Sequence, residues 1–387
     1  MQVSNKRDLG LYVHVPFCST TCDFCAFYQE RPSKKGFEQY FFALEQDFRA
    51  HLENVEFSTV FIGGGTPGLL SSIQIEKLCT LIRDAGLNAN YEWSVEVAPN
   101  EITSDKIEAL LNGGVNRLSI GIQTFNQEFM NGLGRDHDVE SALNAYELVR
   151  NAGFNSVNLD LLFGAPGQSL EDWQDDLAKA VELEPDHIST YCLTFEEDTA
   201  LYAKLSKGEI KIDPEREAEF YELAWDYLPN HGLFQYEVSN YAKAAMESVH
   251  NLNTWGMNDW IGCGPSASTQ LNGVRKKNFS NIDQWGRNLI SGKPQEYEEW
   301  TELDEAEIAR DAVVFGLRMN RGINLDEICK RFSLPISIFS QINRFLDLLV
   351  NEGLAEYQEG NYRLNREGRM RCDGIAKEMP ELDRAVV

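Results

Sequence analysis

The amino-acid sequence predicts an α/β fold: a partial (β/α)6 barrel followed by a small C-terminal α+β domain with a winged-helix-like order of elements. Three observations predict this fold. Apolar runs of strand length alternate with longer helix-like segments through the first half of the chain. Glycines or polar residues follow several of these runs. After a linker near Lys293–Thr301, which contains Pro294 and a glutamate-rich run, the pattern changes to helices followed by a hairpin.

The barrel elements are expected in strict alternation. The strands are expected in the run that starts at Leu11 and at Ser58–Ile62, Tyr91–Val97, Arg117–Gln123, Ser156–Phe163 and His187–Leu193. The helices between them are expected at Gly36–Asn54, Ile73–Gly86, Ile107–Asn112, Glu140–Gly153 and Leu170–Glu182. About six β–α repeats are fewer than a closed eight-stranded barrel needs, so we expect an open barrel with a parallel sheet.

The rest of the chain divides into two further parts. We expect residues 1–200 to form the barrel, residues 201–293 to extend it toward a ligand, and residues 301–387 to form the C-terminal domain. The stretch Glu196–Pro229 is acidic and helical. In the C-terminal domain we expect helices at Asp304–Met319, Leu325–Phe332 and Ser337–Asn351 and hairpin strands at Leu354–Tyr357 and Asn361–Leu364.

Composition restricts the class of protein and its partners. With 387 residues, 43% of them hydrophobic and 25% charged, the chain is typical of a soluble globular protein. Its net charge of −26 repels nucleic acid and anionic lipid, and the last helix of the C-terminal domain carries only Arg344 as a basic residue. Nucleic acid is therefore not expected as a binding partner, and no membrane-spanning segment is expected. The N-terminal stretch Met1–Arg7 lacks the apolar segment of a signal peptide, and scattered cysteines suit a reducing compartment, so a cytoplasmic location is expected.

Three cysteines follow the first strand at short spacing. Cys18, Cys22 and Cys25 are separated by three and then two residues, so their sulfurs can converge on one inorganic centre. Structural zinc sites and ferredoxin-type clusters normally take four protein ligands, and three thiolates leave one position of a cubane cluster open. A zinc site and ordinary buried or disulfide-bonded cysteines are the alternatives. His14 stands upstream on the strand, at the wrong spacing for a zinc knuckle.

Polar residues mark the carboxyl ends of the predicted strands. Glu96, Gln123 and Asp160 occupy such positions, where parallel α/β folds build their sites. Any one of them could simply bind loop N–H groups. Gly63–Pro67, a Gly-Gly-Gly-Thr-Pro sequence, ends another strand and can bring backbone N–H groups close to a ligand, although a tight turn would have similar glycines.

Together these motifs resemble the radical S-adenosylmethionine (SAM) superfamily, in which SAM chelates the fourth iron of a [4Fe-4S] cluster. The resemblance implies that Cys18, Cys22 and Cys25 hold the cluster. Four further residues, Tyr12, His14, Pro16 and Phe17, restrict the resemblance to the branch of oxygen-independent coproporphyrinogen III oxidases and HemW-type haem chaperones. The resemblance covers nearly the whole chain.

The resemblance also implies a set of SAM-binding residues. The glycine loop would bind the amino group of SAM, Glu96 the ribose hydroxyls, and Phe24 would lie against the adenine. The full set is Tyr12, Phe24, Gly64, Gly65, Thr66, Glu96, Gln123, Arg135, Asp160, Cys192 and Ser268. The family usually has Asn-Pro shortly after the strand glutamate, where this chain has Ala98 and Pro99.

A histidine in residues 201–293 is the candidate haem ligand. His250 is followed by Asn251 and Trp255, and an imidazole in an aromatic setting can ligate haem iron, although a lone histidine more often satisfies a core or surface position. The stretch resembles a His-Asn-x-x-Tyr-Trp motif of HemW-type proteins, with Thr254 in place of the tyrosine. The resemblance thus implies haem binding by His250, Asn251 and Trp255.

Phe27 separates the two activities in this branch. Coproporphyrinogen oxidases of this type have a fourth cysteine at that position and an N-terminal extension, whereas this chain has Phe27 and places Tyr12 almost at its start. The resemblance therefore favours a haem chaperone that carries haem as cargo to acceptor haemoproteins, with a homodimer as a possible assembly. The alternative is an enzyme of porphyrin biosynthesis that cleaves SAM and oxidatively decarboxylates coproporphyrinogen III to protoporphyrinogen IX. Whether the chain is an enzyme stays open at this point, and a pure interaction protein is disfavoured because it would leave the SAM residues without use.

Overall fold

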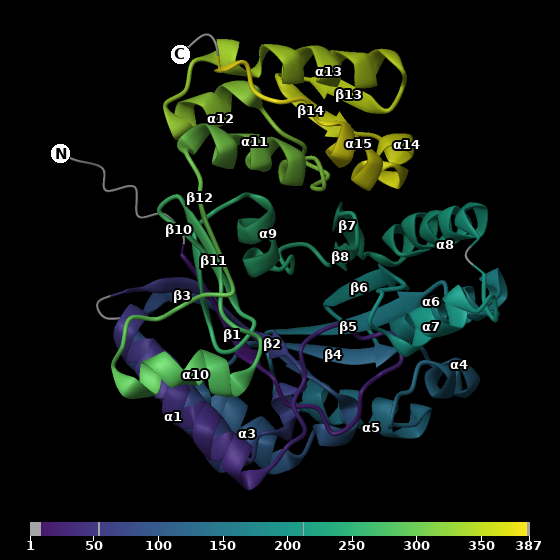
Figure 1. Ribbon diagram of the computed structural model, residues 1–387. Coiled ribbons are helices and arrows are strands. Elements are labelled where there is room, and N and C mark those ends of the chain that lie inside the picture. The colour runs from purple at the N-terminus through teal and green to yellow at the C-terminus, as the bar shows by residue number, and fades with distance from the viewer. Residues whose placement is uncertain (1–8, 53–54, 212, 385–387) are drawn as a thin grey trace.

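The computed structural model describes residues 9–52, 55–211 and 213–384 and confirms the predicted α/β fold. Six parallel strands lie side by side in chain order (Figure 1). These strands are β1 (Gly10–Val15), β2 (Phe57–Gly64), β3 (Leu87–Val97), β4 (Arg117–Gln123), β5 (Ser156–Phe163) and β6 (His187–Cys192). Their side chains alternate: Leu118 and Ile120 of β4 are fully buried in the core, whereas Ser119 between them lines a cavity.

The helices that connect these strands pack on the outer face of the sheet. They are α1 (Lys34–His51), α2 (Ser72–Ala85), α3 (Ser104–Gly113), α5 (Val139–Ala152) and α6 (Leu170–Glu182). Local sequence fixes their ends, since Ser71 and Ser169 form capping boxes before α2 and α6, and α5 ends at Gly153 in the left-handed conformation. Among the helices of the described residues, none combines the length and apolar character needed to cross a membrane.

Several elements differ in extent from the predictions. Helix α1 ends at His51, and the predicted end at Asn54 lies outside the described residues, as does the Met1–Arg7 stretch. Helix α4 (Gln127–Gly132) was not predicted because it has six residues and buries only Met130. Such a short helix has no apolar periodicity to detect.

Residues 234–302 extend the sheet at both of its edges. Strands β7 (Phe234–Glu237) and β8 (Asn240–Ala242) lie beside β6. The chain then passes through α9 (Val249–Trp255) to the opposite edge. There β9 (Trp260–Cys263) pairs parallel with β1, followed by antiparallel β10 (Ser268–Leu271), β11 (Val274–Lys277) and β12 (Glu299–Glu302). Helix α10 (Ile282–Ser291), which lies against α1, was not predicted either.

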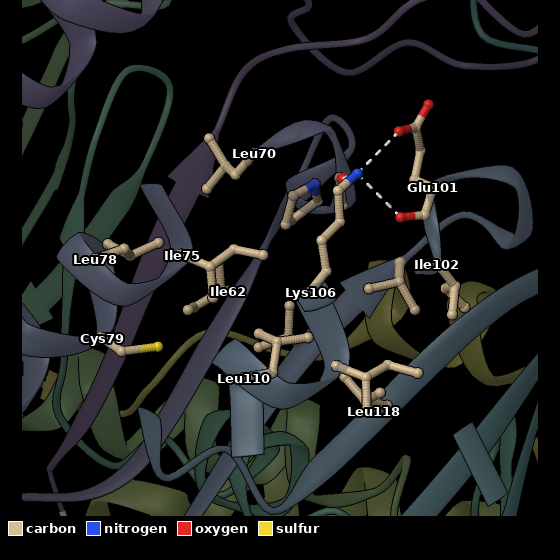
Figure 2. A pocket seen from close by; sticks show the side chains of 15 residues that line it. Ile62, Leu70, Ile75, Leu78, Cys79, Glu101, Ile102, Lys106, Leu110 and Leu118 are labelled. Carbon is tan, nitrogen blue, oxygen red and sulfur yellow. Dashed lines mark hydrogen bonds and ion pairs between the residues drawn. The ribbon is translucent and has the colours of Figure 1, made fainter. Parts of the chain in front are cut away.

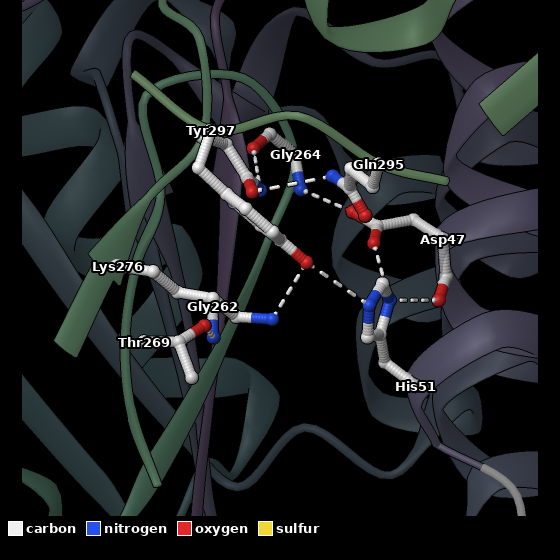
Figure 3. A network of polar contacts seen from close by, with 9 residues as sticks. Asp47, His51, Gly262, Gly264, Thr269, Lys276, Gln295 and Tyr297 are labelled. Atoms are coloured by element: carbon white, nitrogen blue, oxygen red, sulfur yellow. Dashed lines mark hydrogen bonds and ion pairs between the residues drawn. The ribbon is translucent and has the colours of Figure 1, made fainter. Parts of the chain in front are cut away.

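The predicted linker is held against the barrel. Its last residues form β12, which pairs with β11, so only the preceding part is irregular. Figure 3 shows the contacts: Lys276 Nζ lies 2.7 Å from the hydroxyl of Tyr297, whose oxygen is 3.4 Å from His51 Nε2. His51 Nδ1 is in turn 3.0 Å from Oδ1 of the buried Asp47. This network fixes the point at which the chain leaves the barrel.

The C-terminal domain is built around a second hydrophobic core, to which Val238 and Met257 of the preceding segment also contribute. Helices α11 (Glu305–Gly316), α12 (Leu325–Phe332) and α13 (Ser340–Asn351) precede a hairpin of β13 (Ala355–Gln358) and β14 (Asn361–Leu364), which is the predicted winged-helix-like order. Two short helices follow, α14 (Arg366–Met370) and α15 (Cys372–Glu378). The predicted acidic helical stretch follows β6 in the chain and contains α7 (Ala200–Ser206) and α8 (Pro214–Tyr227).

Candidate functional site

A cavity of about 730 Å³ opens at the carboxyl ends of the parallel strands. Its size falls in the range of small-molecule sites, roughly 300–1,000 Å³. Most of the predicted site residues line it. They are Cys18, Cys22, Phe24, Cys25, Gly64, Gly65, Thr66, Glu96, Gln123, Arg135, Asp160 and Cys192.

The loop with the three cysteines leaves β1 and forms one wall of this cavity. Its backbone is anchored, since the Cys18 N–H donates to the Glu30 carbonyl at 3.0 Å. All three thiols are free, and burial raises the pKa of Cys18 while the Thr66 hydroxyl, 3.4 Å from its sulfur, lowers it. Arg135 Nη1 lies 3.3 Å from the sulfur of Cys22. Within the described residues no three His, Cys, Asp or Glu side chains are arranged to hold a single metal ion.

The glycine loop lies against this wall because only glycine fits there. A Cβ on Gly64, whose φ is +109°, would be 2.5 Å from the ring of His14. On Gly65 it would be 2.7 Å from the Phe17 carbonyl oxygen. The Gly65 and Thr66 N–H groups donate to the carbonyls of Val15 and Phe17, which ties the loop to the cysteine segment.

Two half-buried carboxyl groups face the cavity from neighbouring parts of the sheet. The pKa of Glu96 is raised to about 8 by burial and by the nearby Asp160, although the Gly64 N–H donates to its Oε2 at 3.3 Å. Burial also raises the pKa of Asp160, which accepts from Ser119 Oγ and from Asn158 Nδ2, each at 2.8 Å. Carboxyl oxygens placed in this way can accept hydrogen bonds from ligand hydroxyl or ammonium groups.

Gln123 and Arg135 complete the rim. Gln123 has a φ of +72° and follows an irregularity in the β4–β5 pairing, a strained conformation that is rare outside glycine and concentrates at functional sites. Arg135 Nη2 donates to the Gly121 carbonyl at 2.9 Å, whereas its buried Nε has no partner in the protein. A buried donor without a partner beside an open cavity is suited to bind a ligand oxygen.

Two of the predicted SAM residues do not line the cavity. The Tyr12 hydroxyl bonds to His14 Nδ1 at 3.0 Å, and its ring stacks on Phe61, so Tyr12 lies behind His14 within the barrel. Burial raises its pKa well above the ordinary value, with a smaller contribution from Glu96. Ser268 begins β10, two strands beyond β1, and is exposed there, while its carbonyl accepts from Trp260 Nε1. A direct ligand contact from Ser268 is therefore not part of this geometry.

The three predicted haem residues share α9, but their surroundings differ. His250 is 8% exposed, stacks on Phe61 and bonds through Nδ1 to Thr59 Oγ1 at 2.9 Å. Burial lowers its pKa to about 4, so the ring is neutral near pH 7. The Asn251 N–H donates to the helix-capping Ser248. Trp255 packs instead on Phe315 of the C-terminal domain.

Three further residues at or near the cavity, Lys106, Ser119 and Asn158, were not predicted from the sequence. Figure 2 shows Lys106 beside Glu101, to whose carbonyl Nζ donates at 3.1 Å and whose carboxylate lies 3.4 Å away. The same Nζ donates to the carbonyl of Gly68 at 2.6 Å, directly after the glycine loop, and so joins that segment to the next rim loop. The sequence gives no signal for these backbone contacts. Ser119 and Asn158 were detectable in principle, because polar residues alternate there with apolar ones along β4 and β5.

Comparisons with known proteins agree with this geometry. The Radical SAM superfamily model matches residues 12–180, and the HemN C-terminal domain model matches residues 303–371. Heme chaperone HemW of Bacillus subtilis (strain 168) is 32% identical over 366 residues, which cover 93% of this chain and 96% of that protein. Heme chaperone HemW of Escherichia coli (strain K12) is 37% identical over 267 residues, 67% of this chain and 69% of that protein.

A solved structure agrees over nearly the whole chain. The coproporphyrinogen III oxidase HemN from Escherichia coli, a radical SAM enzyme, matches with a TM-score of 0.82 and 25% identity over 96% of this chain and 89% of that chain. The radical SAM match implies a [4Fe-4S] cluster and SAM as cofactors. The chain therefore belongs to the radical SAM superfamily and, within it, to the family of the proteins named Heme chaperone HemW.

Proposed function

We propose that this chain is a haem chaperone that carries a [4Fe-4S] cluster on Cys18, Cys22 and Cys25, binds SAM in the adjoining cavity and delivers haem to haemoproteins. The observation that carries the chaperone assignment is the match over 93% of the chain to a protein named Heme chaperone HemW. The cavity supplies the chemical support, because three free thiols and the polar rim meet in it.

The donor set of the cavity fits both cofactors. Three thiols would ligate three irons and leave the fourth to the amino and carboxyl groups of SAM. The Arg135 guanidinium, with one unpartnered buried nitrogen, is suited to an anionic ligand group, and the Glu96 and Asp160 carboxyls to hydroxyls. When bound, the cluster and SAM supply one-electron chemistry, and the protein provides orientation and exclusion of water.

Helix α9 is the proposed haem-binding segment. The His250 ring is neutral near pH 7, and the Thr59 hydroxyl can accept its Nδ1–H at 2.9 Å. A hydrogen bond donated by Nδ1–H fixes the tautomer in which Nε2 can coordinate a metal. The ring is 8% exposed, so only a small part of it is open to haem in this conformation.

The environment of Phe27 supports the chaperone over the oxidase. Phe27 lines the cavity and is 70% exposed. Phe27 has no thiol, whereas the oxidases of this branch carry a fourth cysteine at this position. The coproporphyrinogen oxidase activity stays the alternative because of the HemN match over nearly the whole chain.

Haem titration and product analysis test this proposal. The anaerobically reconstituted protein is titrated with haem, mixed with an apo-haemoprotein, and assayed separately with coproporphyrinogen III, SAM and a reductant. We expect a Soret band, haem transfer to the acceptor and no protoporphyrinogen. His250→Ala should lose most of the band, whereas His231→Ala, at an exposed histidine, should keep it. Decarboxylated product would favour the oxidase, and an unchanged band in His250→Ala would exclude His250 from the haem site.

A further inference from the structure

A continuous chain of buried polar side chains lies inside the barrel behind Asp160. It consists of Asn158 on β5, His187 on β6 and Tyr236 on β7, and none of these residues lines the cavity. Asn158 is 3% exposed and His187 1%. Burying polar groups costs free energy unless each finds a partner, so the bonds they make are informative.

The bonds connect Asp160 to α9 without interruption. Asn158 Nδ2 lies 2.8 Å from Asp160 Oδ1, and Asn158 Oδ1 lies 2.6 Å from His187 Nδ1. His187 Nε2 is 2.8 Å from the Tyr236 hydroxyl, which is 3.2 Å from the backbone nitrogen of Ser248. Ser248 caps the N-terminus of α9.

The chemistry of the groups gives every bond in this chain the same direction. The Asp160 carboxylate accepts, so the Asn158 amide donates to it through Nδ2 and offers Oδ1 as an acceptor. His187 must then donate through Nδ1–H, which leaves Nε2 to accept from the Tyr236 hydroxyl. The hydroxyl oxygen accepts in turn from the Ser248 N–H. Burial lowers the pKa of His187 well below its ordinary value, which is consistent with this neutral tautomer.

Hydrogen bonds aligned in one direction polarise each other and strengthen the last one. That last bond holds Asp160 Oδ1, while Ser119 Oγ, at 2.8 Å, holds Oδ2. Asn158 Nδ2 also lies 2.6 Å from Ser119 Oγ and 3.0 Å from Ser189 Oγ, so these two hydroxyls share in positioning the carboxyl group. The bonds of Asn158, His187 and Tyr236 thus connect the Asp160 carboxyl to the start of α9.

We propose that His187 and Tyr236 are positioning residues that orient the Asp160 carboxyl for SAM. This inference rests on the proposed SAM site and names two residues that support it from outside the cavity. The C-terminal domain also contacts Tyr236, because the Asn320 N–H donates to the Tyr236 carbonyl at 2.9 Å.

The test measures SAM affinity and iron content of the full-length, anaerobically reconstituted protein. Tyr236→Phe removes only the hydroxyl and should raise the Kd for SAM roughly threefold to tenfold, at unchanged iron content. Tyr146→Phe is the matched control, since the hydroxyl of Tyr146 donates to the Leu183 carbonyl on the outer face of the barrel. The control should lose similar thermal stability but change the Kd by less than about twofold.

A pair of similar-sized substitutions at His187 separates positioning from packing. His187→Asn keeps a donor for Asn158 Oδ1, whereas His187→Leu offers none. We expect His187→Leu to bind SAM roughly tenfold more weakly than wild type, and His187→Asn to recover part of that loss. A purely structural role would weaken both variants alike.

The outcomes distinguish this inference from the proposed function. Equal SAM affinity in wild type, Tyr236→Phe and Tyr146→Phe would overturn the positioning role and leave the SAM site intact. An equal loss in both tyrosine variants, or no recovery in a folded His187→Asn, would also overturn it. A wild-type protein that holds its cluster but fails to bind SAM would overturn the SAM site and this inference together.

Discussion

Glu96 is a half-buried acid on the wall of the cavity. Its pKa of about 8 lies above the ordinary value of 4.5 because burial and Asp160 disfavour the charged form. Between these two values the folded state holds a proton that the unfolded state has released. The contribution of Glu96 to the free energy of unfolding is therefore undiminished below about pH 4.5 and falls as pH rises through about 8.

Glu96→Gln should therefore flatten the pH dependence of stability. In urea denaturation of the cofactor-free protein, we expect the variant to gain stability relative to wild type between pH 6 and pH 9, on the order of a few kcal/mol. Glu76→Gln, at an exposed position on α2, is the control and should leave the pH dependence unchanged. A constant difference between Glu96→Gln and wild type across this pH range would refute the raised pKa.

Gly64→Ala and Gly153→Ala separate backbone strain from close contact. Both glycines have positive φ, +109° and +90°, but a Cβ would be 2.5 Å from the His14 ring at Gly64 and would meet nothing within 4 Å at Gly153. We expect Gly153→Ala to cost roughly 1 kcal/mol of stability without affecting SAM binding. Gly64→Ala should cost about 1–3 kcal/mol more and abolish SAM binding, measured by denaturation and equilibrium dialysis. Normal SAM affinity in Gly64→Ala would contradict the close approach of this loop.

Lys106→Met should loosen the two loops that Lys106 joins. Loss of its bonds to the Gly68 and Glu101 carbonyls should destabilise the protein by about 1–2 kcal/mol and weaken SAM binding several-fold. Lys179→Met serves as a control because Lys179 pairs with Glu182 at the surface, and it should change neither quantity. If Lys106→Met destabilised the protein but left SAM affinity intact, Lys106 would support the fold without shaping the site.

At the scale of elements, periodic patterns predicted the barrel well. Strands β4 and β5 have the predicted boundaries because every second residue is apolar and packs into the core. The elements that sequence missed are short or half exposed. Strand β12 is exposed along its whole length and is defined by its pairing with β11, a partner that no local pattern reveals.

Helix α9 was located by its motif, but its contacts were not predictable. His250 packs on β2, and Trp255 packs on α11, because the chain crosses from one edge of the sheet to the other at this point. Such long-range packing depends on topology, which periodicity does not encode. The predicted cysteine and rim residues meet in one cavity because they lie at or after the carboxyl ends of parallel strands. The order of strands and helices along the sequence predicts this arrangement.

Arg331→Met should weaken the attachment of the C-terminal domain to α9. Arg331 Nη1 and Nη2 donate to the carbonyls of Gly256 and Met257 at 2.6 and 2.7 Å. We expect a loss of about 1–3 kcal/mol and faster proteolysis in the linker before β12. Arg344→Met, at an exposed position of the same domain, should behave as wild type. Unchanged proteolysis in Arg331→Met would show that other contacts hold the domain.

In the whole molecule, the residues that line the cavity all come from the segment 18–196, and later parts of the chain support these residues from behind. The barrel supplies the thiols and the polar rim, and residues 234–255 reach the back of the same site through Tyr236 and Ser248. The sequence predicted the order of the barrel, its extension and the C-terminal domain. It did not predict the bonds of Tyr236 with His187 and Ser248, because these residues are separated in the chain.

The proposed function depends on Cys18, Cys22 and Cys25 holding a [4Fe-4S] cluster with one iron open to SAM. Electron paramagnetic resonance of the reduced, anaerobically reconstituted protein, with iron and sulfide analysis, tests it most directly. We expect about four irons and four sulfides per chain, a cluster signal that changes when SAM is added, and loss of the signal in Cys22→Ala. Bound zinc in place of iron, or a cluster signal that SAM leaves unchanged, would contradict the claim.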